Sequence, residues 1–219
     1  MKTQTAWDDG TKKRLIEAAG EVFAQSGYRS ATVREICKRA NASVSAVNYH
    51  FKDKEGLYSA VFEYAHRLAT EKYPHDWGLG PGATPEERLR VFIRSLLLRG
   101  LGGGFPAWHE KLVTAEISDP SGIFSKVAES SIRPMHGLLE EIVRELLKKN
   151  NPFGEADDET IRICSMNVVG QCIFQHHARQ LMVFEISKNM KPEEIVAISE
   201  KIFRFSIAGI RAIASDTHC

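Results

Sequence analysis

The stretch TVREICKRANASVSAVNYHFKDKEGL, residues 32–57, decides the fold. It predicts a short helix, a tight turn at Asn41, a second short helix over residues 44–50, and then a longer third helix. Thr32 and Ser43 are hydroxyl residues placed to cap the two short helices, and asparagine tolerates the left-handed backbone of a tight turn. This arrangement is typical of a helix-turn-helix unit, which places its second helix in the major groove of DNA.

The neighbouring segments complete a three-helix domain. Apolar residues recur at helical spacing over residues 11–26, and Gly27 is expected to end that helix. Glu35 stands three residues after Thr32, so we expect it to complete a capping box. A further helix over residues 54–72 is expected to connect this domain to the rest of the chain.

The rest of the chain is also helical in pattern. A loop rich in proline and glycine, residues 74–85, follows the connecting helix. Helices are expected beyond it at residues 85–100, 106–117, 121–150 with a kink or break at Pro134, 157–186 and 193–214. The sequence therefore predicts an all-α protein: a helix-turn-helix domain over residues 1–55, linked by helix 54–72 to a second helical domain over residues 56–219.

Composition limits the class of protein. The 219 residues are 43% hydrophobic and 26% charged, with a net charge of +1, which is ordinary for a globular protein. Residues 1–55 contain ten basic and seven acidic side chains, a net +3 that leaves −2 for the remainder. No segment has the roughly 18 unbroken apolar residues of a membrane span, and the N-terminus lacks a secretory pattern. The four cysteines form no CxxC pair, so we expect free thiols and a cytoplasmic protein.

Helix 44–50 carries the residue types that a recognition helix needs. Val44 and Val47 are its expected apolar anchors, and Asn48 has the amide that bonds bidentately to adenine. Hydroxyl, aromatic and basic side chains at the flanks are suited to phosphate contacts. The predicted DNA-binding residues are Thr32, Arg34, Val44, Ser45, Asn48, Tyr49, His50 and Lys54. An ordinary solvated helix face is the alternative that these residues alone leave open.

Residues 27–57 resemble the N-terminal domain of the TetR family of transcriptional repressors. The matching motifs are Gly27-Tyr28, Thr32, Val44-Ser45, Tyr49-His50-Phe51 and Lys54-Glu55-Gly56-Leu57. The chain departs from the family pattern at Asn41, where a turn glycine is usual, and at Asn48, where tyrosine is frequent. The base preference of other members therefore does not transfer to this chain.

The second half is similar to the C-terminal domain of CecR-like regulators. The segments that carry this resemblance begin at Trp108, Ser131 and Gly170. The resemblance implies control of efflux or transporter genes, a homodimer formed through the last two helices, and a cavity for a small-molecule effector. It also implies a palindromic double-stranded DNA operator, whereas no cofactor and no membrane partner are expected.

The last expected helix independently suggests a dimer. It carries two apolar rows, whereas a surface helix needs one buried stripe. The rows are Ile195, Ile198, Ile202 and Phe205, and Val196, Phe203, Ile207 and Ile210. One row is expected to pack within the chain's own domain, and the other against a second copy of the chain.

A ligand cavity needs an apolar lining with a few polar groups. The candidate lining residues are Trp108, His109, Arg133, Met135, Gln171, Phe174, Gln175 and His176. Among them, Arg133 would accept a carboxylate, although the low charge of the set favours a largely apolar ligand. Ordinary core packing is the alternative for the aromatic residues and Met135.

Other functions are weaker alternatives. Cys172 and His176 lie four residues apart, with Cys164 two turns earlier, but no tetrahedral ligand set is complete, so no metal site is predicted. The pair His109-Glu110 shows no spacing to a nucleophile that would indicate an enzyme. A DNA-binding regulator without a small-molecule inducer, controlled by a protein partner, is the other alternative.

Overall fold

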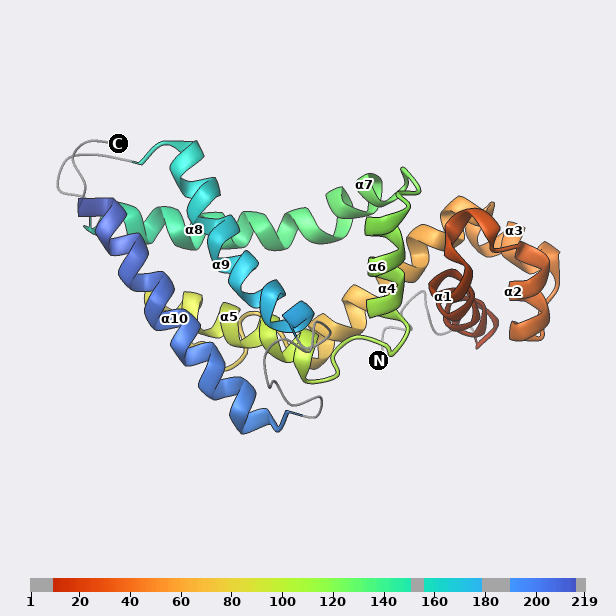
Figure 1. The fold of residues 1–219 in the computed structure, drawn as a ribbon, viewed down its shortest axis with the longest axis horizontal. Helices are drawn as coiled ribbons and strands as arrows, with labels where there is room; N and C mark the ends of the chain where they lie inside the picture. The colour runs from red at the N-terminus through yellow and green to blue at the C-terminus, as the bar shows by residue number, and fades with distance from the viewer. Residues whose placement is uncertain (1–9, 151–155, 179–189, 216–219) are drawn as a thin grey trace. The chain divides into compact units, whose positions relative to one another are not determined.

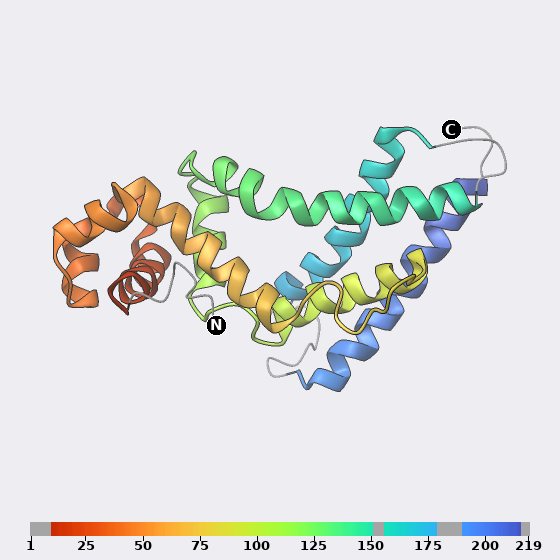
Figure 2. The same ribbon diagram turned by 180° about the vertical axis from the view of Figure 1, so that it is seen from behind.

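The computed structural model describes residues 10–150, 156–178 and 190–215, and every regular element among them is a helix. The chain forms two compact units, Met1–Leu68 with Phe105–Ile132, and Ala69–Gly104 with Arg133–Cys219, called here unit 1 and unit 2. Figure 1 traces the order of the helices, and Figure 2 shows the same path from behind. The all-α prediction is confirmed, and no helix of the described residues is long and apolar enough to cross a membrane.

Unit 1 is built around the helix-turn-helix stretch. Its helices are α1 Gly10–Ser30, α2 Val33–Ala40, α3 Val44–Phe51, the greater part of α4 Lys54–Lys72, α6 His109–Ser118 and α7 Phe124–Val127, followed by a π-helical turn Ala128–Ile132. The core joins apolar residues of all these helices, including Leu15, Ile36, Val47, Leu57 and Leu112, which are fully buried. Helix α6 packs on α1, although residues 106–117 were expected in the C-terminal domain.

Local chemistry ends the helices of unit 1 where the sequence requires it. Gly27 interrupts α1 with a φ of 70°, and Asn41 ends α2 in the left-handed region with φ 48° and ψ 54°. The Thr32 and Ser43 hydroxyls accept the backbone N–H groups of Glu35 and Ala46, as predicted for two N-caps. Each short helix therefore begins and ends at a fixed residue.

Unit 2 is a helical bundle. It contains α5 Pro85–Leu101, α8 Arg133–Asn150, α9 Asp158–Ala178 and α10 Pro192–Ser215. Helix α5 contacts the other three, and α9 crosses α8 obliquely, in front of it in Figure 1 and behind it in Figure 2. A single apolar core, which includes Phe92, Leu139, Ile161, Ile195 and Ile207, holds the four helices together. A capping box between Thr84 and Glu87 starts α5.

The sequence predicted a kink or break of helix 121–150 at Pro134, and the regular α-helix is interrupted just before that residue. The chain has a π-helical turn just before Arg133 and Pro134, and α8 begins at Arg133, because proline is accepted in the first turn of a helix. The expected helix 121–150 is therefore divided into α7, the π-helical turn and α8. The end of the expected helix 157–186 falls partly outside the described residues.

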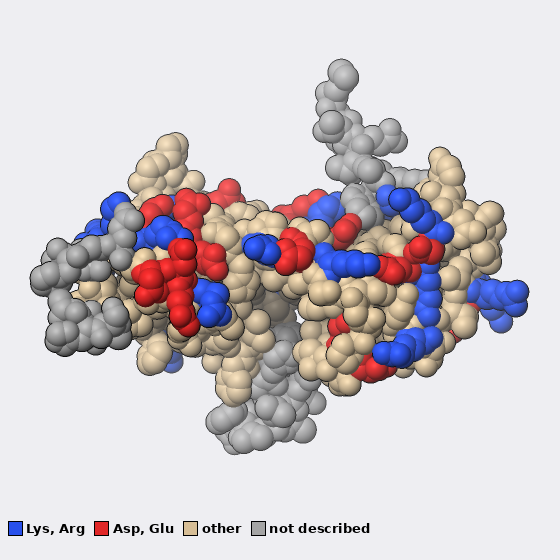
Figure 3. Space-filling view, turned by 90° about the horizontal axis from the view of Figure 1, so that it is seen from above, with Lys and Arg blue, Asp and Glu red and all other residues tan. Residues whose placement is uncertain are grey.

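Charge is evenly distributed on the face shown in Figure 3, where acidic and basic side chains are interspersed. Charged side chains form ion pairs within unit 2, among them Arg88 with Glu141 and Glu145 at 2.9 and 2.8 Å, and Lys149 with Glu86 at 2.9 Å. In each of these pairs one partner is largely buried, since the Arg88 and Glu86 side chains are only 21% and 18% exposed. On the face in Figure 3, charges of one sign form no broad field.

Candidate nucleic-acid interface and ligand site

Helix α3 presents one polar face to solvent. Val47 and Phe51 are buried in the core of unit 1. Ser45, Asn48 and Tyr49 lie on the opposite side and are exposed, and the Tyr49 side chain is 83% exposed. These three residues have the i, i+3, i+4 spacing of neighbours on one helix face, so they are available together to a partner.

Val44 does not anchor α3, and that part of the prediction is wrong. Its side chain is 44% exposed, whereas Val47 is fully buried. The reason is position, because Val44 directly follows the Ser43 cap and lies in the first turn, outside the packed side of the helix. An exposed valine at this point remains compatible with its predicted place in the DNA-binding set, since an apolar side chain is suited to a thymine methyl group.

The exposed face of α3 is free of competing carboxylates. The helix contains no acidic residue. The nearby carboxylates are engaged: Glu35 forms an ion pair with Arg39 at 3.8 Å, and Asp53 accepts the Gly56 N–H at 2.8 Å. The face is therefore suited to an anionic polymer.

Thr32 and Arg34, at the start of α2, are also exposed. His50 is half-buried, and its ring lies 4.9 Å from that of Tyr49. Lys52 follows α3 with a φ of 72° and an exposed side chain. Sequence reasoning omitted Lys52, although its position directly after the recognition helix was a signal for a further phosphate contact.

Lys54 is held by unit 1 itself. Its Nζ donates to the Arg29 carbonyl at 3.2 Å and lies 4.5 Å from the centroid of the Tyr28 ring. Burial lowers the pKa of this amine. These contacts fix the start of α4 against the end of α1, and an ammonium group has three donors, so one bond to a carbonyl leaves capacity for a phosphate.

The predicted ligand residues are divided between the two units. Trp108 and His109 belong to unit 1. A Cβ placed on Gly20 of α1 would lie 2.4 Å from the Trp108 ring, and the His109 ring stacks on Phe105 with centroids 4.0 Å apart. Both rings are therefore packing elements within unit 1.

The other six residues belong to unit 2. Gln171 donates to the Ser206 hydroxyl and to the Asn167 carbonyl, both at 3.2 Å, so it joins α9 to α10. Met135 is half-buried and packs on the core of unit 2. Arg133 and Phe174 are exposed and Gln175 is half-buried, while the side chain of His176 lies outside the described residues.

Arg99 is a functional candidate that sequence reasoning missed. Its side chain, on α5, is only 4% exposed. Nε donates to the Tyr73 carbonyl at 2.9 Å, and Nη1 lies 3.6 Å from the Met135 sulfur. A signal was present, because this arginine interrupts the apolar run from Leu96 to Leu101.

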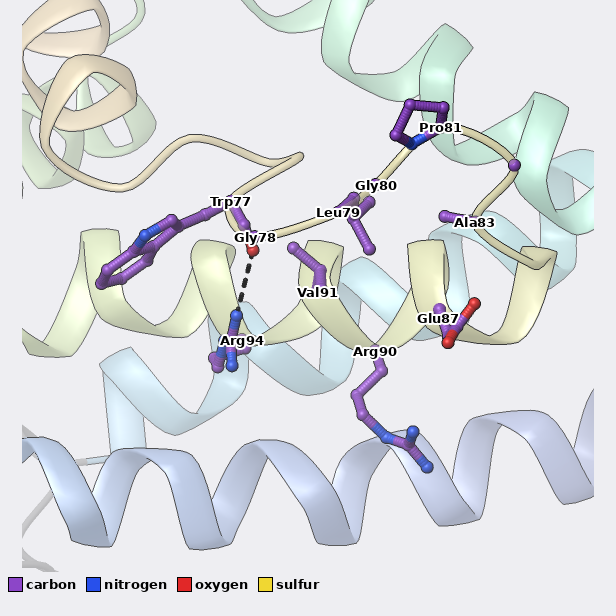
Figure 4. Close-up of a pocket in the computed structure, with 11 residues that line it drawn as sticks. Trp77, Gly78, Leu79, Gly80, Pro81, Ala83, Glu87, Arg90, Val91 and Arg94 are labelled. Atoms are coloured by element: carbon purple, nitrogen blue, oxygen red, sulfur yellow. Dashed lines mark hydrogen bonds between the residues drawn. The ribbon is translucent and has the colours of Figure 1, made fainter.

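A surface cavity of about 580 Å³ lies between the glycine-rich loop after α4 and helix α5. Figure 4 shows Trp77, Arg90 and Arg94 along its lining, with Arg94 directed to the Trp77 carbonyl, which accepts from it at 3.2 Å. Arg90 forms an ion pair with Glu200 at 3.1 Å. The cavity is therefore open, and the arginines that line it already have partners.

Comparison with known proteins identifies the family. Residues 15–61 match the model of bacterial regulatory proteins of the tetR family, and residues 85–210 match that of the C-terminal domain of the HTH-type transcriptional dual regulator CecR. The chain belongs to the TetR family. Its C-terminal domain is of the CecR type, and the family resemblance found in the sequence is confirmed.

Curated relatives agree with this assignment. CecR of Shigella flexneri is 30% identical over 146 residues, which is 60% of this chain and 62% of that protein. The alignment thus spans about three fifths of the relative's length. The regulator YvkB of Bacillus subtilis is 39% identical over 51 residues, 23% of this chain and 27% of that protein. These relatives are transcriptional regulators and not enzymes.

Solved structures of regulators share the fold. FadR of Bacillus subtilis, in complex with stearoyl-CoA, has a TM-score of 0.67 at 19% identity, covering 90% of this chain and 98% of that one. AibR, in complex with isovaleryl coenzyme A and operator DNA, has a TM-score of 0.61 at 17% identity, covering 88% and 98%.

Proposed function

We propose that this TetR-family regulator is a homodimeric repressor that binds a palindromic operator through α3 and is released by a small molecule bound in unit 2. Control of efflux or transporter genes is part of the proposal, because the C-terminal domain is of the CecR type. The observation that carries the proposal is the exposed face of α3, which offers Ser45, Asn48 and Tyr49 without a carboxylate among them.

Base reading is assigned to Asn48 and Ser45, and phosphate binding to Thr32, Tyr49, His50 and Lys54. An asparagine amide donates to and accepts from one adenine edge at once, whereas a tyrosine hydroxyl at the helix flank is suited to a phosphate oxygen. Arg34 and Val44 border this face. The expected functional difference is that base readers affect sequence preference and phosphate contacts affect affinity on every sequence.

Dimerisation is assigned to the outer faces of α9 and α10. Large apolar side chains remain exposed there: Ile163 and Met166 on α9 are 46% and 54% exposed, and Phe205 and Ile213 on α10 are 73% and 39% exposed. Small residues such as Gly170 and Gly209 are also exposed on these helices. A helix pair with an apolar inner and outer face is suited to a four-helix interface with a symmetry mate.

Selection from a random duplex library with the full-length protein tests the DNA assignment. We expect a palindrome whose half-sites are about one helical turn apart, roughly 34–36 Å. Asn48→Ala should change the preferred base, with a loss of about 1–3 kcal/mol at that position. Lys52→Ala should weaken binding on all sequences alike, and Lys191→Ala, which removes the same charge from unit 2, serves as the matched control. An unchanged preference in Asn48→Ala would refute its assignment as a base reader.

Sedimentation of the full-length protein tests the dimer. Phe205→Glu places a charge on the proposed interface and should yield monomers at micromolar concentration, because an unpaired charge is not tolerated in an apolar contact. Ile117→Glu is the control, since Ile117 is 68% exposed but lies on α6 of unit 1. Dimers of unchanged strength in Phe205→Glu would contradict this interface.

A further inference from the structure

Arg99 carries a buried positive charge for which the described part of the chain supplies no counter-charge. The side chain is 4% exposed, and its Nη2 atom is fully buried with no hydrogen-bond acceptor. The two contacts of the guanidinium are to a backbone carbonyl, at Tyr73, and to a sulfur, at Met135. Neither of these groups carries a negative charge, so the cation is solvated only in part.

Such an arrangement is costly for folding alone. Buried arginine is normally paired with a carboxylate, and an uncompensated buried charge destabilises a protein by several kcal/mol. Burial lowers the pKa of Arg99, but a guanidinium does not lose its proton in proteins at neutral pH. The charge therefore persists, and a buried donor without an acceptor marks a place where a partner is absent.

A second group beside Arg99, the side chain of His75, would also be favoured by a nearby anion. His75 is half-buried, and its pKa is lowered first by burial and then by the charge of Arg99, with exposed Asp76 acting in the opposite direction. Both side chains belong to unit 2. An anion near Arg99 would therefore meet the guanidinium donor and would also relieve the repulsion that His75 experiences.

The surroundings of this charge are apolar. The two residues that contact its guanidinium, Tyr73 and Met135, both pack against the apolar core of unit 2, and Met135 contributes a flexible, unbranched side chain from α8. Methionine adapts to irregular shapes more readily than branched side chains do. A ligand that places an anionic group on Arg99 would thus keep the rest of its structure among hydrocarbon groups.

We propose that the effector of this regulator is an apolar molecule with an anionic head group, a carboxylate or a phosphate, that binds the free Nη2 donor of Arg99. This inference rests on the proposed function, in which a small molecule binds in unit 2. Arg99 selects the chemical class of the ligand: a neutral molecule of the same shape leaves the buried charge unpaired and binds more weakly.

The test compares three probes with the same ten-carbon chain on the full-length protein: decanoate, decyl phosphate and neutral 1-decanol. Binding is measured by thermal shift and by tryptophan fluorescence. We expect at least one anionic probe to stabilise the wild type and to bind about 10- to 100-fold more tightly than decanol, as a charge-assisted hydrogen bond of about 1.5–3 kcal/mol implies. A comparison of decanoate binding with decyl phosphate binding distinguishes the two head groups.

Variants then assign the effect to Arg99. Arg99→Met should lose the preference for anionic probes, whereas Arg99→Lys, which retains the charge, should keep part of it. Arg94→Met is the matched control, because Arg94 is also an α5 arginine that donates to a carbonyl of the same loop, that of Trp77. Circular dichroism and operator binding confirm that each variant is folded.

Three results would overturn the proposal: no stabilisation of the wild type by either anionic probe, equal binding of decanol, or an unchanged anionic preference in both Arg99 variants. Operator release, measured in parallel, separates this inference from the proposed function. Arg99-dependent binding without release of the operator would support the anion site and refute the ligand switch. Release by decanol alone would support the switch and refute the anion site.

Discussion

Tyr58→Phe tests the hydrogen bond that joins α4 to α6 inside unit 1. The Tyr58 hydroxyl donates to Glu116 Oε2 at 2.6 Å, and the two residues are 1% and 6% exposed. A buried hydrogen bond to a charged acceptor contributes about 1.5–3 kcal/mol. Glu116 keeps two bonds from Ser121, one from its N–H and one from its hydroxyl, so the substitution removes this bond without isolating the carboxylate.

The expected loss in free energy of unfolding is about 1.5–3 kcal/mol, or roughly 3–12 °C in Tm at about 2–4 °C per kcal/mol for a chain of this size. Urea and thermal unfolding measure it. Tyr64→Phe, in the same helix, is the matched control. The Tyr64 hydroxyl donates to Glu17 at 3.2 Å, and the Glu17 side chain is half exposed. This variant should therefore lose less than about 1 kcal/mol in free energy of unfolding.

The raised pKa of Tyr58 determines how the stability difference between wild type and Tyr58→Phe depends on pH. Burial first, and then the bond to Glu116, raise the pKa of Tyr58 above its ordinary value of 10. A raised folded-state pKa means that this stability is fully present below the unfolded pKa and is lost as pH rises beyond it. The difference between wild type and Tyr58→Phe should therefore be constant from about pH 6 to 9 and shrink above about pH 10. Equal stability of the two proteins at pH 7, or additivity of Tyr58→Phe with Glu116→Gln, would refute the reasoning.

Three glycine and turn substitutions give further tests. Asn41→Ala should cost about 1–2 kcal/mol in urea unfolding, because Asn41 has a φ of 48°, whereas Asn41→Gly should be nearly neutral. Gly56→Ala places a Cβ 2.0 Å from the Phe51 carbonyl oxygen, so it should shift the junction of α3 and α4 and weaken operator binding in a gel-shift assay; Gly80→Ala, in open space, should not. Gly20→Ala, whose Cβ would lie 2.4 Å from the Trp108 ring, should cost about 1–3 kcal/mol and change tryptophan emission. Its control is Gly137→Ala in α8, which has open space around it and should stabilise by about 0.5–1 kcal/mol.

Local chemistry explains what the sequence predicted well. The turn at Asn41 and the caps at Thr32 and Ser43 depend on residues within three positions of one another, so one short stretch specifies them. Only half of the capping box expected at Thr32 forms: the Thr32 hydroxyl accepts from the Glu35 N–H, whereas the Glu35 carboxylate pairs with Arg39. A box requires a particular glutamate rotamer, which sequence spacing does not determine.

Tertiary packing explains what the sequence did not predict. Trp108 was a candidate for a ligand cavity, with core packing as the alternative, and its ring packs on Gly20, 88 positions earlier in the chain. Helical periodicity identifies an apolar residue but not the glycine that accommodates it. Arg99 was missed for a related reason: arginine is almost always exposed, so its place in an apolar run did not by itself indicate the buried guanidinium that the packing of α5 produces. The dimer face and the base contacts of Asn48 stay predictions, because both require a second molecule.

The contacts of Arg99 also indicate how ligand binding in unit 2 would affect helix α4. Helix α4 is divided between the units, with Leu68 in one and Ala69 in the other, and it ends beside Tyr73, whose N–H donates to Ala69. The Tyr73 carbonyl accepts from Ser95 at 2.6 Å and from Arg99 at 2.9 Å. An anion that binds the free Nη2 donor engages the same guanidinium group whose Nε holds the Tyr73 carbonyl, so we expect it to alter the restraint on the end of α4. A differential of about 5.5 kcal/mol moves a two-state protein from almost fully one state to the other. One hydrogen bond supplies only part of that, so the apolar portion of the effector must supply the rest, and chain length should affect operator release more steeply than head-group identity.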